Sequence, residues 1–557
     1  MASALVQNIV GEVRASAPYV QETLAVVAQK QARSDAELGE HAIGAAFPGR
    51  CVLGTQQRRS TRGVSDTVLA FSTPRCSRRD VVPKDYFENP LRRCTDPHRV
   101  TTALLTRPDA RRIYDPVGEG CAPRLPFLRR LLKHPRVMQY NRLIVLAVTV
   151  NLGWAVYGAT AGNWWTSEGT DLRAIAFMAQ TNLAAAVLFR QQYILNASAW
   201  LATRAPTSWP LRVRWALGKY YHLGGLHVGT ALAGTLWYLA LATSMIRDAV
   251  AGVGDASPAN TIFVATLATT FSVMVVMALP RLRAAQHDRF EITHRFCGWA
   301  ALVLMWINTL LVVNGDRGDR SFGSALLTAP AFWLVVLSAL LAVWPWLLLR
   351  RVPVSCERPS SHAVIVRLDH HGIPPVGTTR PVSRRPFVGW HHFANVPAAP
   401  GMAGYRMLVS RAGDWTSDFV DNPPTHVWVR GIPAVGVANV RRLFSKVVLV
   451  ATGSGIGPLL GHLLDTSVPA QLVWVTKNPR LTYGEAFVDE IQAAHPDAMI
   501  WDTDALGKPD VLQLAYEAYV ESGAEAVICV SNRTVTGQVV HGLEQRGIPA
   551  FGPIWDS

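Results

Sequence analysis

The chain has 557 residues, of which 49% are hydrophobic and 17% charged, and this composition excludes a single soluble domain of ordinary size. The formal net charge is +15, but much of this excess lies in short loops between apolar segments, where it suits a lipid surface and argues against nucleic acid as a partner. Seven cysteines without CxxC or zinc spacing predict neither a disulfide framework nor a structural metal.

Residues 1–135 form an arm without a repeat, rich in Arg, Ser, Pro and Thr after its first thirty residues. Those first residues have the pattern of an amphipathic helix with charges along it, so we expect no secretory signal peptide. The first apolar span is then expected to act as its own insertion signal.

Residues 136–351 carry six apolar stretches long enough to cross about 30 Å of hydrocarbon as helices. They lie at 143–164, 175–200, 223–245, 261–279, 297–313 and 326–349. The loops 124–136, 204–219, 281–289 and 350–351 are basic, and the alternate loops are acidic or balanced. This alternation predicts a multi-pass membrane protein with both termini in the cytoplasm.

Two smaller domains are expected after the spans. Residues 352–444 hold short strand-like runs separated by Pro and Gly, which predicts a small antiparallel barrel. In residues 445–557, strand-like and helical stretches alternate, which is typical of an α/β nucleotide-binding domain.

The sequence ATGSGIGP, at 451–458, follows the first strand of this α/β pattern and opens a helix. Gly453, Gly455 and Gly457 would let a pyrophosphate approach the backbone, and the helix start near Pro458 would offer it free N–H groups. The alternative is a tight strand-to-helix turn that binds nothing.

The next strand ends in VWVTKNPR, which places Lys477 and Arg480 where the 2′-phosphate of NADP would lie. The alternative for these two cations is simple solvation. The choice between NADP and NAD therefore depends on two side chains.

The stretches WHHFAN (390–395) and SRAGDWTSDF (410–419), together with the glycine turn, resemble the flavin and nicotinamide elements of the ferric reductase and NADPH oxidase superfamily. The reductase half of that superfamily has the ferredoxin-reductase fold. Trp390, His391 and Phe393 match its flavin motif, while His392 replaces the usual proline and Ala394 the usual hydroxyl residue.

The same resemblance assigns further residues to the cofactors. It implies that FAD and NADP, or NAD, are bound, and that Cys529 lies near the nicotinamide. The residues implied for the flavin diphosphate are Arg411, Gly413, Trp415, Thr416 and Ser417.

The superfamily holds haem iron between histidines of its third and fifth helices, and YHLGGLHVG (221–229) and HRFCGW (294–299) stand at the corresponding places. The candidate ligands are His294 with either His222 or His227, because residues five apart on a helix are about 140° apart and cannot both bind one iron. The alternative is that these histidines only cap helix ends.

A second haem would need a histidine pair about four turns further along the same helices. Leu236 and Asn308 occupy the positions fourteen residues beyond His222 and His294, so we expect one haem b at most.

The C-terminal stretch from 507 onward and the HxxGGxH pattern of the third span are similar to the TmpA-like integral membrane branch of this superfamily. The resemblance covers about residues 130–557. Some members also carry an adenylate-forming domain, which this sequence does not show.

Two functions remain open. The first is a membrane oxidoreductase that passes electrons from NAD(P)H through FAD to a haem near the inner leaflet and on to an unknown acceptor. The second is a reductase-like scaffold that has lost catalysis and acts in sensing or signalling. A transporter is a weaker alternative, because the spans show neither an internal repeat nor intramembrane charges.

Overall fold

The computed structural model of the protein describes residues 126, 133–253, 257–368, 374–398 and 404–554. The chain divides into two compact units, 1–90 and 91–557, and every described residue belongs to the second. The predictions for the arm of residues 1–135 therefore lie almost entirely outside the described residues.

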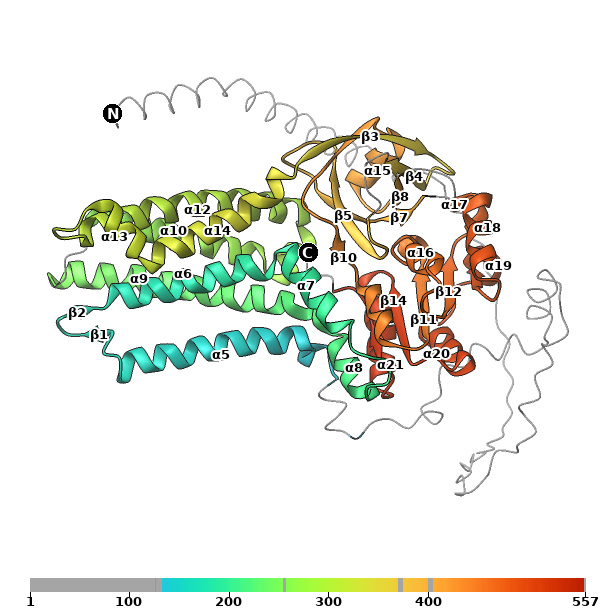
Figure 1. Cartoon of the computed structure of the whole chain (residues 1–557), viewed down its shortest axis with the longest axis horizontal. Coiled ribbons are helices and arrows are strands. Elements are labelled where there is room, and N and C mark those ends of the chain that lie inside the picture. The colour runs from blue at the N-terminus through green and yellow to red at the C-terminus, as the bar shows by residue number, and fades with distance from the viewer. Residues whose placement is uncertain (1–125, 127–132, 254–256, 369–373, 399–403, 555–557) are drawn as a thin grey trace, which may run out of the picture. The chain divides into compact units, whose positions relative to one another are not determined.

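The first half of the described chain is helical (Figure 1). Its α-helices are α5 (Gln139–Thr160), α6 (Leu172–Phe189), α7 (Gln192–Ala202), α8 (Leu211–Leu217), α9 (Gly224–Ala251), α10 (Pro258–Met277), α11 (Pro280–Ala285), α12 (His287–Asp316), α13 (Phe322–Thr328) and α14 (Pro330–Leu347). Two 3-10 turns, η4 (Pro135–Val137) and η5 (Tyr220–Leu223), and a small hairpin of β1 (Trp165–Thr166) and β2 (Gly169–Thr170) complete it.

Six helical segments among the described residues are long and apolar enough to cross a membrane, judged by length and composition: α5, α6, residues 211–251, α10, α12 and α14. The predicted helix at 175–200 is wrong in one respect, because it breaks at Gln191 into α6 and α7. The polar side chains of α7 explain the break. Asn196 bonds Pro433 O and Val435 N, at 2.8 and 2.9 Å, and so satisfies backbone groups of the barrel that follows.

Five of the long helices pack in a ring in the order α6, α9, α10, α12, α14, and α5 packs outside the ring against α9. The contact of α5 with α9 depends on Gly225 and Gly229. A Cβ atom at Gly225 would lie 2.2 Å from Tyr140 O, and one at Gly229 would lie 2.7 Å from Ala147 Cβ. Only glycine allows the two helix backbones to approach this closely.

The end of the bundle remote from the barrel is filled by side chains. Trp237 is 5% exposed, stacks on Trp165 at 6.4 Å between ring centres, and donates to Asn151 Oδ1 at 2.8 Å. Asn308 is buried, while Leu236 faces outward with 53% exposure. Leu236 and Asn308 are the positions fourteen residues beyond the predicted haem ligands His222 and His294, and neither of them lies beside an empty space.

Eight strands follow in one antiparallel sheet. They are β3 (Arg350–Glu357), β4 (Ala363–Leu368), β5 (Thr378–Ser383), β6 (His391–Ala394), β7 (Val396–Pro397), β8 (Tyr405–Ser410), β9 (His426–Val429) and β10 (Ala434–Val435). Their order is β10-β5-β9-β3-β4-β8-β7, with β6 on β5. Helix α15 (Asp414–Asp421) packs on this sheet, and the predicted antiparallel barrel is confirmed as a nearly closed one.

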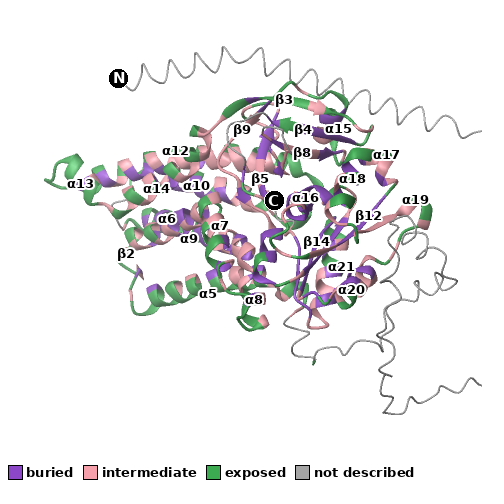
Figure 2. Cartoon of the chain, turned by 45° about the vertical axis from the view of Figure 1, so that its right-hand side comes forward, coloured by how far each residue is buried: buried purple, intermediate pink, exposed green. Residues whose placement is uncertain are grey.

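The last part is an α/β domain with a parallel sheet. It comprises η6 (Val437–Leu443), β11 (Val447–Thr452), η7 (Gly453–Gly455), α16 (Ile456–Leu464), β12 (Ala470–Thr476), α17 (Pro479–Tyr483), α18 (Glu485–Ala494), β13 (Met499–Asp502), α19 (Thr503–Leu506), α20 (Val511–Ser522), β14 (Ala526–Val530), α21 (Arg533–Glu544) and β15 (Ala550–Phe551). The strand order is β13-β12-β11-β14-β15, and the central strands are buried on both faces (Figure 2). The strand order reverses between β11 and β14, and in sheets of this kind ligands bind at that edge.

Candidate functional site

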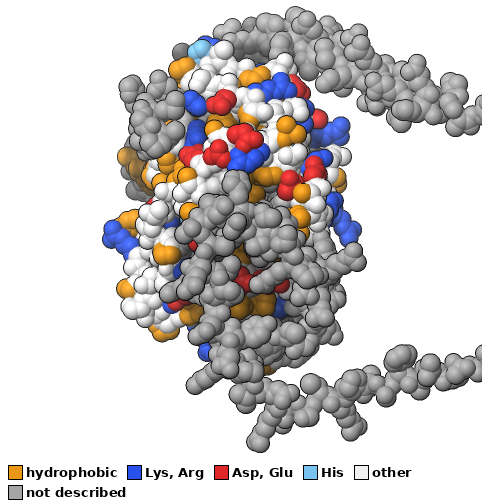
Figure 3. Space-filling view, turned by 90° about the vertical axis from the view of Figure 1, so that its right-hand side faces the viewer, with side chains coloured by type: hydrophobic (Ala, Val, Ile, Leu, Met, Phe, Trp, Pro, Cys, Tyr) orange, Lys and Arg blue, Asp and Glu red, His pale blue; other side chains and the backbone are white. Residues whose placement is uncertain are grey.

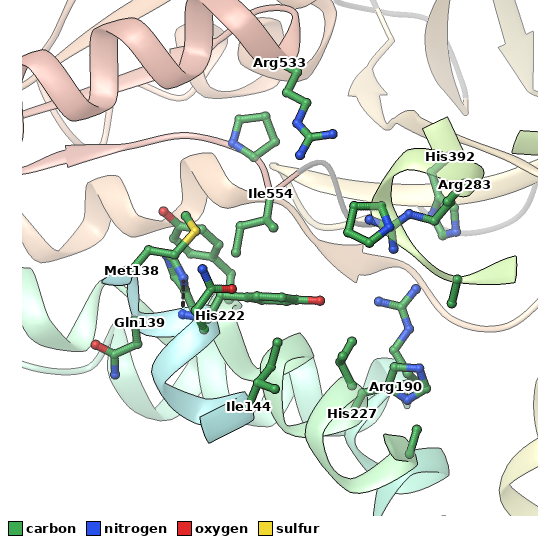
Figure 4. Close-up of a pocket in the computed structure, with 18 of the residues that line it drawn as sticks. Met138, Gln139, Ile144, Arg190, His222, His227, Arg283, His392, Arg533 and Ile554 are labelled. Atoms are coloured by element: carbon green, nitrogen blue, oxygen red, sulfur yellow. Dashed lines mark hydrogen bonds between the residues drawn. The ribbon is translucent and has the colours of Figure 1, made fainter. Parts of the chain in front are cut away.

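One cavity of about 2470 Å³ lies between the helical bundle, the barrel and the α/β domain. Ordinary ligand pockets measure about 300–1,000 Å³, so this cavity has room for more than one cofactor-sized molecule. Figure 4 shows side chains from all three parts facing it, among them His227 of α9, His392 of β6 and Arg533 of α21.

The glycine turn reaches this cavity through Ser454, Gly457 and Pro458. Close packing also favours glycine at two positions of this turn. A Cβ atom at Gly455 would lie 2.1 Å from Val530 O, and one at Gly457 would lie 3.4 Å from Leu408 of the barrel. The strand-turn-helix arrangement is confirmed, and pyrophosphate binding stays a prediction.

All five residues 390–394 line the cavity. His391 and Phe393 pack on the indole of Trp415, at 4.3 and 5.9 Å between ring centres. The pKa of His392 is lowered to about 4 by burial and by the nearby positive charges of Arg430 and Arg190. His392 is therefore neutral at physiological pH.

Of the five residues assigned to the flavin diphosphate, only Thr416 lines the cavity. Arg411 instead forms a two-point ion pair with Asp421, at 2.9 and 2.6 Å, and donates to Ser361 O. The Thr416 hydroxyl accepts the N–H groups of Ala412 and Gly413 at 2.9 and 3.0 Å and so caps the start of α15. Gly413, Trp415 and Ser417 lie outside the cavity wall.

The two cations proposed for the NADP phosphate differ in their surroundings. Arg480 is engaged with Glu485, Asp489 and Gln492, because α17 and α18 bring these side chains around its guanidinium. Lys477 is 77% exposed and lies 3.7 Å from Asp504. The face of the molecule in Figure 3 shows such acidic and basic side chains intermixed. Lys477 is thus the more available partner for a phosphate.

Cys529 does not reach the cavity. It is fully buried in the core that β14 forms with α20 and α21, and burial raises the pKa of its thiol to about 12. The geometry gives no support to a role at the nicotinamide. The residue at the carboxyl edge of β14 is Ser531, whose hydroxyl bonds that of Thr452 at the edge of β11.

His227 and His294 face each other in the wall of the helix ring, with ring centres 6.4 Å apart. His227 Nδ1 lies 2.9 Å from Ala186 O and donates to it, which leaves the lone pair of Nε2 available to a metal. Phe290 packs on His294 at 5.3 Å between ring centres, and the helices of the ring also contribute small residues to the cavity wall, which are Ala186, Ala231, Gly298, Ala301, Ser338 and Ala342. Among the described residues, there is no group of three or more His, Cys, Asp or Glu side chains that could hold a metal ion.

His222 has a different environment. It belongs to η5, and its Nδ1 accepts the backbone N–H of Tyr140 at 3.1 Å. In a neutral imidazole the other nitrogen then carries the proton, so Nε2 has no lone pair for iron. Of the two alternatives for the partner of His294, the structure therefore favours His227.

The sequence did not reveal how basic the cavity is. Among the described residues, its wall contains two carboxylates, those of Glu291 and Glu544. It contains ten cations, which are Lys133, Arg136, Arg142, Arg190, Arg212, Lys219, Arg283, Arg295, Arg430 and Arg533. They come from distant helix ends and loops, so no local motif marks them. Such a wall suits an anionic ligand.

One family model and two curated proteins are similar to this chain. The family described as "Adenylate-forming reductase 03009, C-terminal domain" matches residues 437–557. Adenylate-forming reductase 03009 of Coprinopsis cinerea is 38% identical over 437 residues, which are 77% of this chain and 41% of that protein. Adenylate-forming reductase 06235 of the same fungus is 36% identical over 435 residues, with the same coverage. The chain thus spans about 41% of the length of these curated relatives.

Two solved structures are similar at low scores. A ferredoxin NADP+ reductase from Neisseria gonorrhoeae with bound FAD and NADP has a TM-score of 0.32 and 13% identity, over 37% of this chain and 98% of that one. A flavohemoglobin from Malassezia yamatoensis with bound FAD and heme has a TM-score of 0.33 and 12% identity, over 69% of this chain and 96% of that one. At these scores they support no conclusion about this chain, and the fold is described from its own strand order. Neither the family nor the two relatives carry the ferric reductase or TmpA name, so that resemblance stays a prediction.

Proposed function

We propose that the protein is a membrane-bound NAD(P)H oxidoreductase that moves electrons from a nicotinamide dinucleotide, by way of FAD and one haem b, to an acceptor. When bound, the flavin would accept a hydride and release single electrons, and the haem would carry them one at a time. One observation carries the proposal, namely the single cavity that joins the glycine turn, strand β6 and the pair His227–His294. The word reductase in the names of the matched relatives supports it.

The histidine pair fits a haem. Two metal–nitrogen bonds of about 2 Å, plus roughly 1 Å from each nitrogen to its ring centre, give a separation of roughly 6 Å between ring centres. The rings of His227 and His294 are 6.4 Å apart. Small side chains of the helix ring are among those that line the cavity, and Ala186 O holds His227 in the tautomer that a ligand needs.

Some of the residues expected to bind FAD and NADP are placed so that they could do so. The basic cavity wall suits the diphosphates of FAD and NADP, and the N–H groups at the start of α16 lie beside Ser454 in that wall. Lys477 would contact a 2′-phosphate, which favours NADP over NAD. Arg411 would bind a diphosphate only after leaving Asp421.

A bilayer is the natural surrounding for the six apolar helices, and the basic loops between them support an orientation with the reductase half in the cytoplasm. The protein would then be a multi-pass membrane protein with both termini cytoplasmic. No nucleic acid is needed to explain its charge.

Some observations support an alternative function, that of a reductase-like scaffold in sensing or signalling. Arg411 is occupied by Asp421, Ala394 offers no hydroxyl to a flavin, and the remote half of the bundle is packed with Trp237 and Asn308. A scaffold would keep the fold without binding the cofactors.

The test is an absorption spectrum of the purified full chain, recorded anaerobically before and after NADPH. We expect a flavin band that bleaches and a Soret band that shifts. His227→Ala and His294→Ala should each remove the Soret band and keep the flavin, while His426→Ala, at an exposed site on β9, should change neither. A colourless protein would favour the scaffold, and an unchanged Soret band in His294→Ala would refute the ligand assignment.

A further inference from the structure

His222 is a buried hydrogen-bond donor without an acceptor. Its side chain lies in the cavity wall, and the residue is 3% exposed. Because Nδ1 accepts the N–H of Tyr140, Nε2 carries the proton, and no described group accepts it. An unsatisfied N–H donor at this depth marks a place where a ligand oxygen would be stabilised.

This donor faces a different part of the cavity from the proposed haem ligands. Figure 4 shows His222 near Met138, Gln139 and Ile144 at one end of the view, and His227 with Arg190 at the other. Met138 and Gln139 directly precede Tyr140, the residue that fixes the ring of His222. Ile554, from the C-terminal segment, also lines the cavity.

Met138, Ile144 and Ile554 contribute apolar side chains to the wall at this end, and the cation of Lys219, three residues before His222, lines the same cavity. A ligand here would therefore be a largely apolar molecule with an oxygen acceptor. Among the described residues, we find no further cofactor site beyond the pair His227–His294, because Trp237, Trp165 and their neighbours pack the remote half of the bundle. An electron acceptor is thus expected on the near side, within this same cavity.

We infer that this end of the cavity binds a quinone as the electron acceptor, with the N–H of His222 Nε2 donating to a quinone carbonyl oxygen. The inference rests on the proposed function for its source of electrons. The reaction balances as NADPH + H⁺ + quinone → NADP⁺ + quinol: the nicotinamide loses two electrons as hydride, the hydrogen of that hydride ends as a proton in water once its two electrons have moved on singly, and the quinone takes up two electrons and two protons from water to become the quinol. His222 polarises one carbonyl and positions the ring.

The first experiment measures binding without turnover. Ubiquinone-1, a benzoquinone with one isoprene unit, is titrated into the full chain in lipid nanodiscs, and quenching of tryptophan fluorescence gives the dissociation constant. We expect His222→Phe to raise this constant at least tenfold, and His222→Gln, which restores an N–H donor, to recover part of the affinity. His426→Phe, at an exposed position, should bind as the wild type does.

A second variant tests the same part of the cavity in case His222→Phe does not fold. Ile144→Trp adds bulk to the same wall without removing a hydrogen bond, and it should abolish binding while leaving the absorption spectrum intact. His222→Phe should also keep the Soret band, because His222 is not an iron ligand in this assignment.

Four results would overturn the inference: no binding of ubiquinone-1 to the wild type, equal binding by His222→Phe, unchanged binding by Ile144→Trp, or loss of the Soret band in His222→Phe. Failure of the proposed function is seen separately, as a colourless protein or as no NADPH-dependent bleaching. With the function intact, anaerobic NADPH should reduce ubiquinone-1, and His222→Phe should lose this reduction but keep flavin bleaching.

Discussion

Arg214 of α8 and Glu525 at the start of β14 form a two-point ion pair, with Nη1–Oε2 at 2.8 Å and Nη2–Oε1 at 2.9 Å. The residues are 311 positions apart, and their side chains are 5% and 28% exposed. The same guanidinium donates to Leu443 O at 2.9 Å, and Glu525 also accepts the N–H of Ser445 at 2.7 Å. This pair ties the helical half of the chain to the α/β domain.

We therefore expect Glu525→Ala to loosen this junction. Breaking a buried pair leaves the other charge uncompensated, and because Glu525 is partly exposed we expect the low end of the usual cost, about 3 kcal/mol. Hydrogen exchange of the α8 amides should become roughly a hundredfold faster. Glu521→Gln, at an exposed position on α20, is the control, and equal exchange in the two variants would contradict the prediction.

The same pair predicts a pH dependence. The hydrogen bonds from Arg214 lower the pKa of Glu525 from 4.5 to about 2. A depressed carboxyl pKa stabilises the fold above the unfolded value, and the contribution is lost as pH falls toward the folded value. The stability difference between wild type and Glu525→Ala should shrink as pH falls from about 4.5 to about 2 in thermal unfolding, whereas a constant difference would argue against the ion pair.

Ala394 offers a test by gain of function. It faces the cavity on β6, where the resembled superfamily has a hydroxyl residue. Ala394→Ser should tighten FAD binding about two- to tenfold, since one hydrogen bond contributes about 0.5–1.5 kcal/mol. Fluorescence titration of the apoprotein with FAD measures this change. Ala493→Ser on the exposed side of α18 should leave FAD affinity unchanged, and an equal or weaker affinity in Ala394→Ser would rule out a flavin contact there.

The unequal surroundings of Lys477 and Arg480 predict unequal effects on the nicotinamide cofactor. Lys477→Ala should raise the KM for NADPH about ten- to a hundredfold and leave that for NADH unchanged, because a charged hydrogen bond to a phosphate contributes about 1.5–3 kcal/mol. Arg480→Ala removes contacts to Glu485 and Asp489 but no contact to the dinucleotide. The KM for NADPH and the KM for NADH should therefore both remain unchanged. Steady-state NADPH and NADH oxidation decides this, and a larger effect at Arg480 would reverse the assignment.

Gly455 should be required for folding as well as for binding. A Cβ atom 2.1 Å from Val530 O forces β11 and β14 apart at their carboxyl edge, and overpacking of this kind costs about 1–3 kcal/mol. Gly455→Ala should lower the thermal midpoint. Gly537→Ala, in α21 with nothing within 4 Å of its Cβ, should raise it slightly, because alanine favours a helix by about 0.5–1 kcal/mol. A Gly455→Ala protein as stable as the wild type would show that the close approach is relieved at no cost.

Several features of the site were predictable from sequence because they are local. The strand, glycine turn and helix at 447–464 follow from a buried apolar run, three glycines and a helical apolar period. The position of Cys529 was not predictable in this way. All five residues of β14 are buried, because both faces of a parallel sheet are covered, so no alternation shows which face the thiol takes.

The sequence by itself determined the six apolar helical segments, the antiparallel sheet and the α/β domain, since hydrophobic period and turn residues act over a few residues. Tertiary structure alone decided which polar groups are already engaged. Arg411 and Arg480 are held by carboxylates, His222 is fixed by the N–H of Tyr140, and His227 faces His294 from another helix. Hydrogen bonds and ion pairs depend on atoms meeting within about 3 Å, and only the folded chain brings such distant residues to that distance.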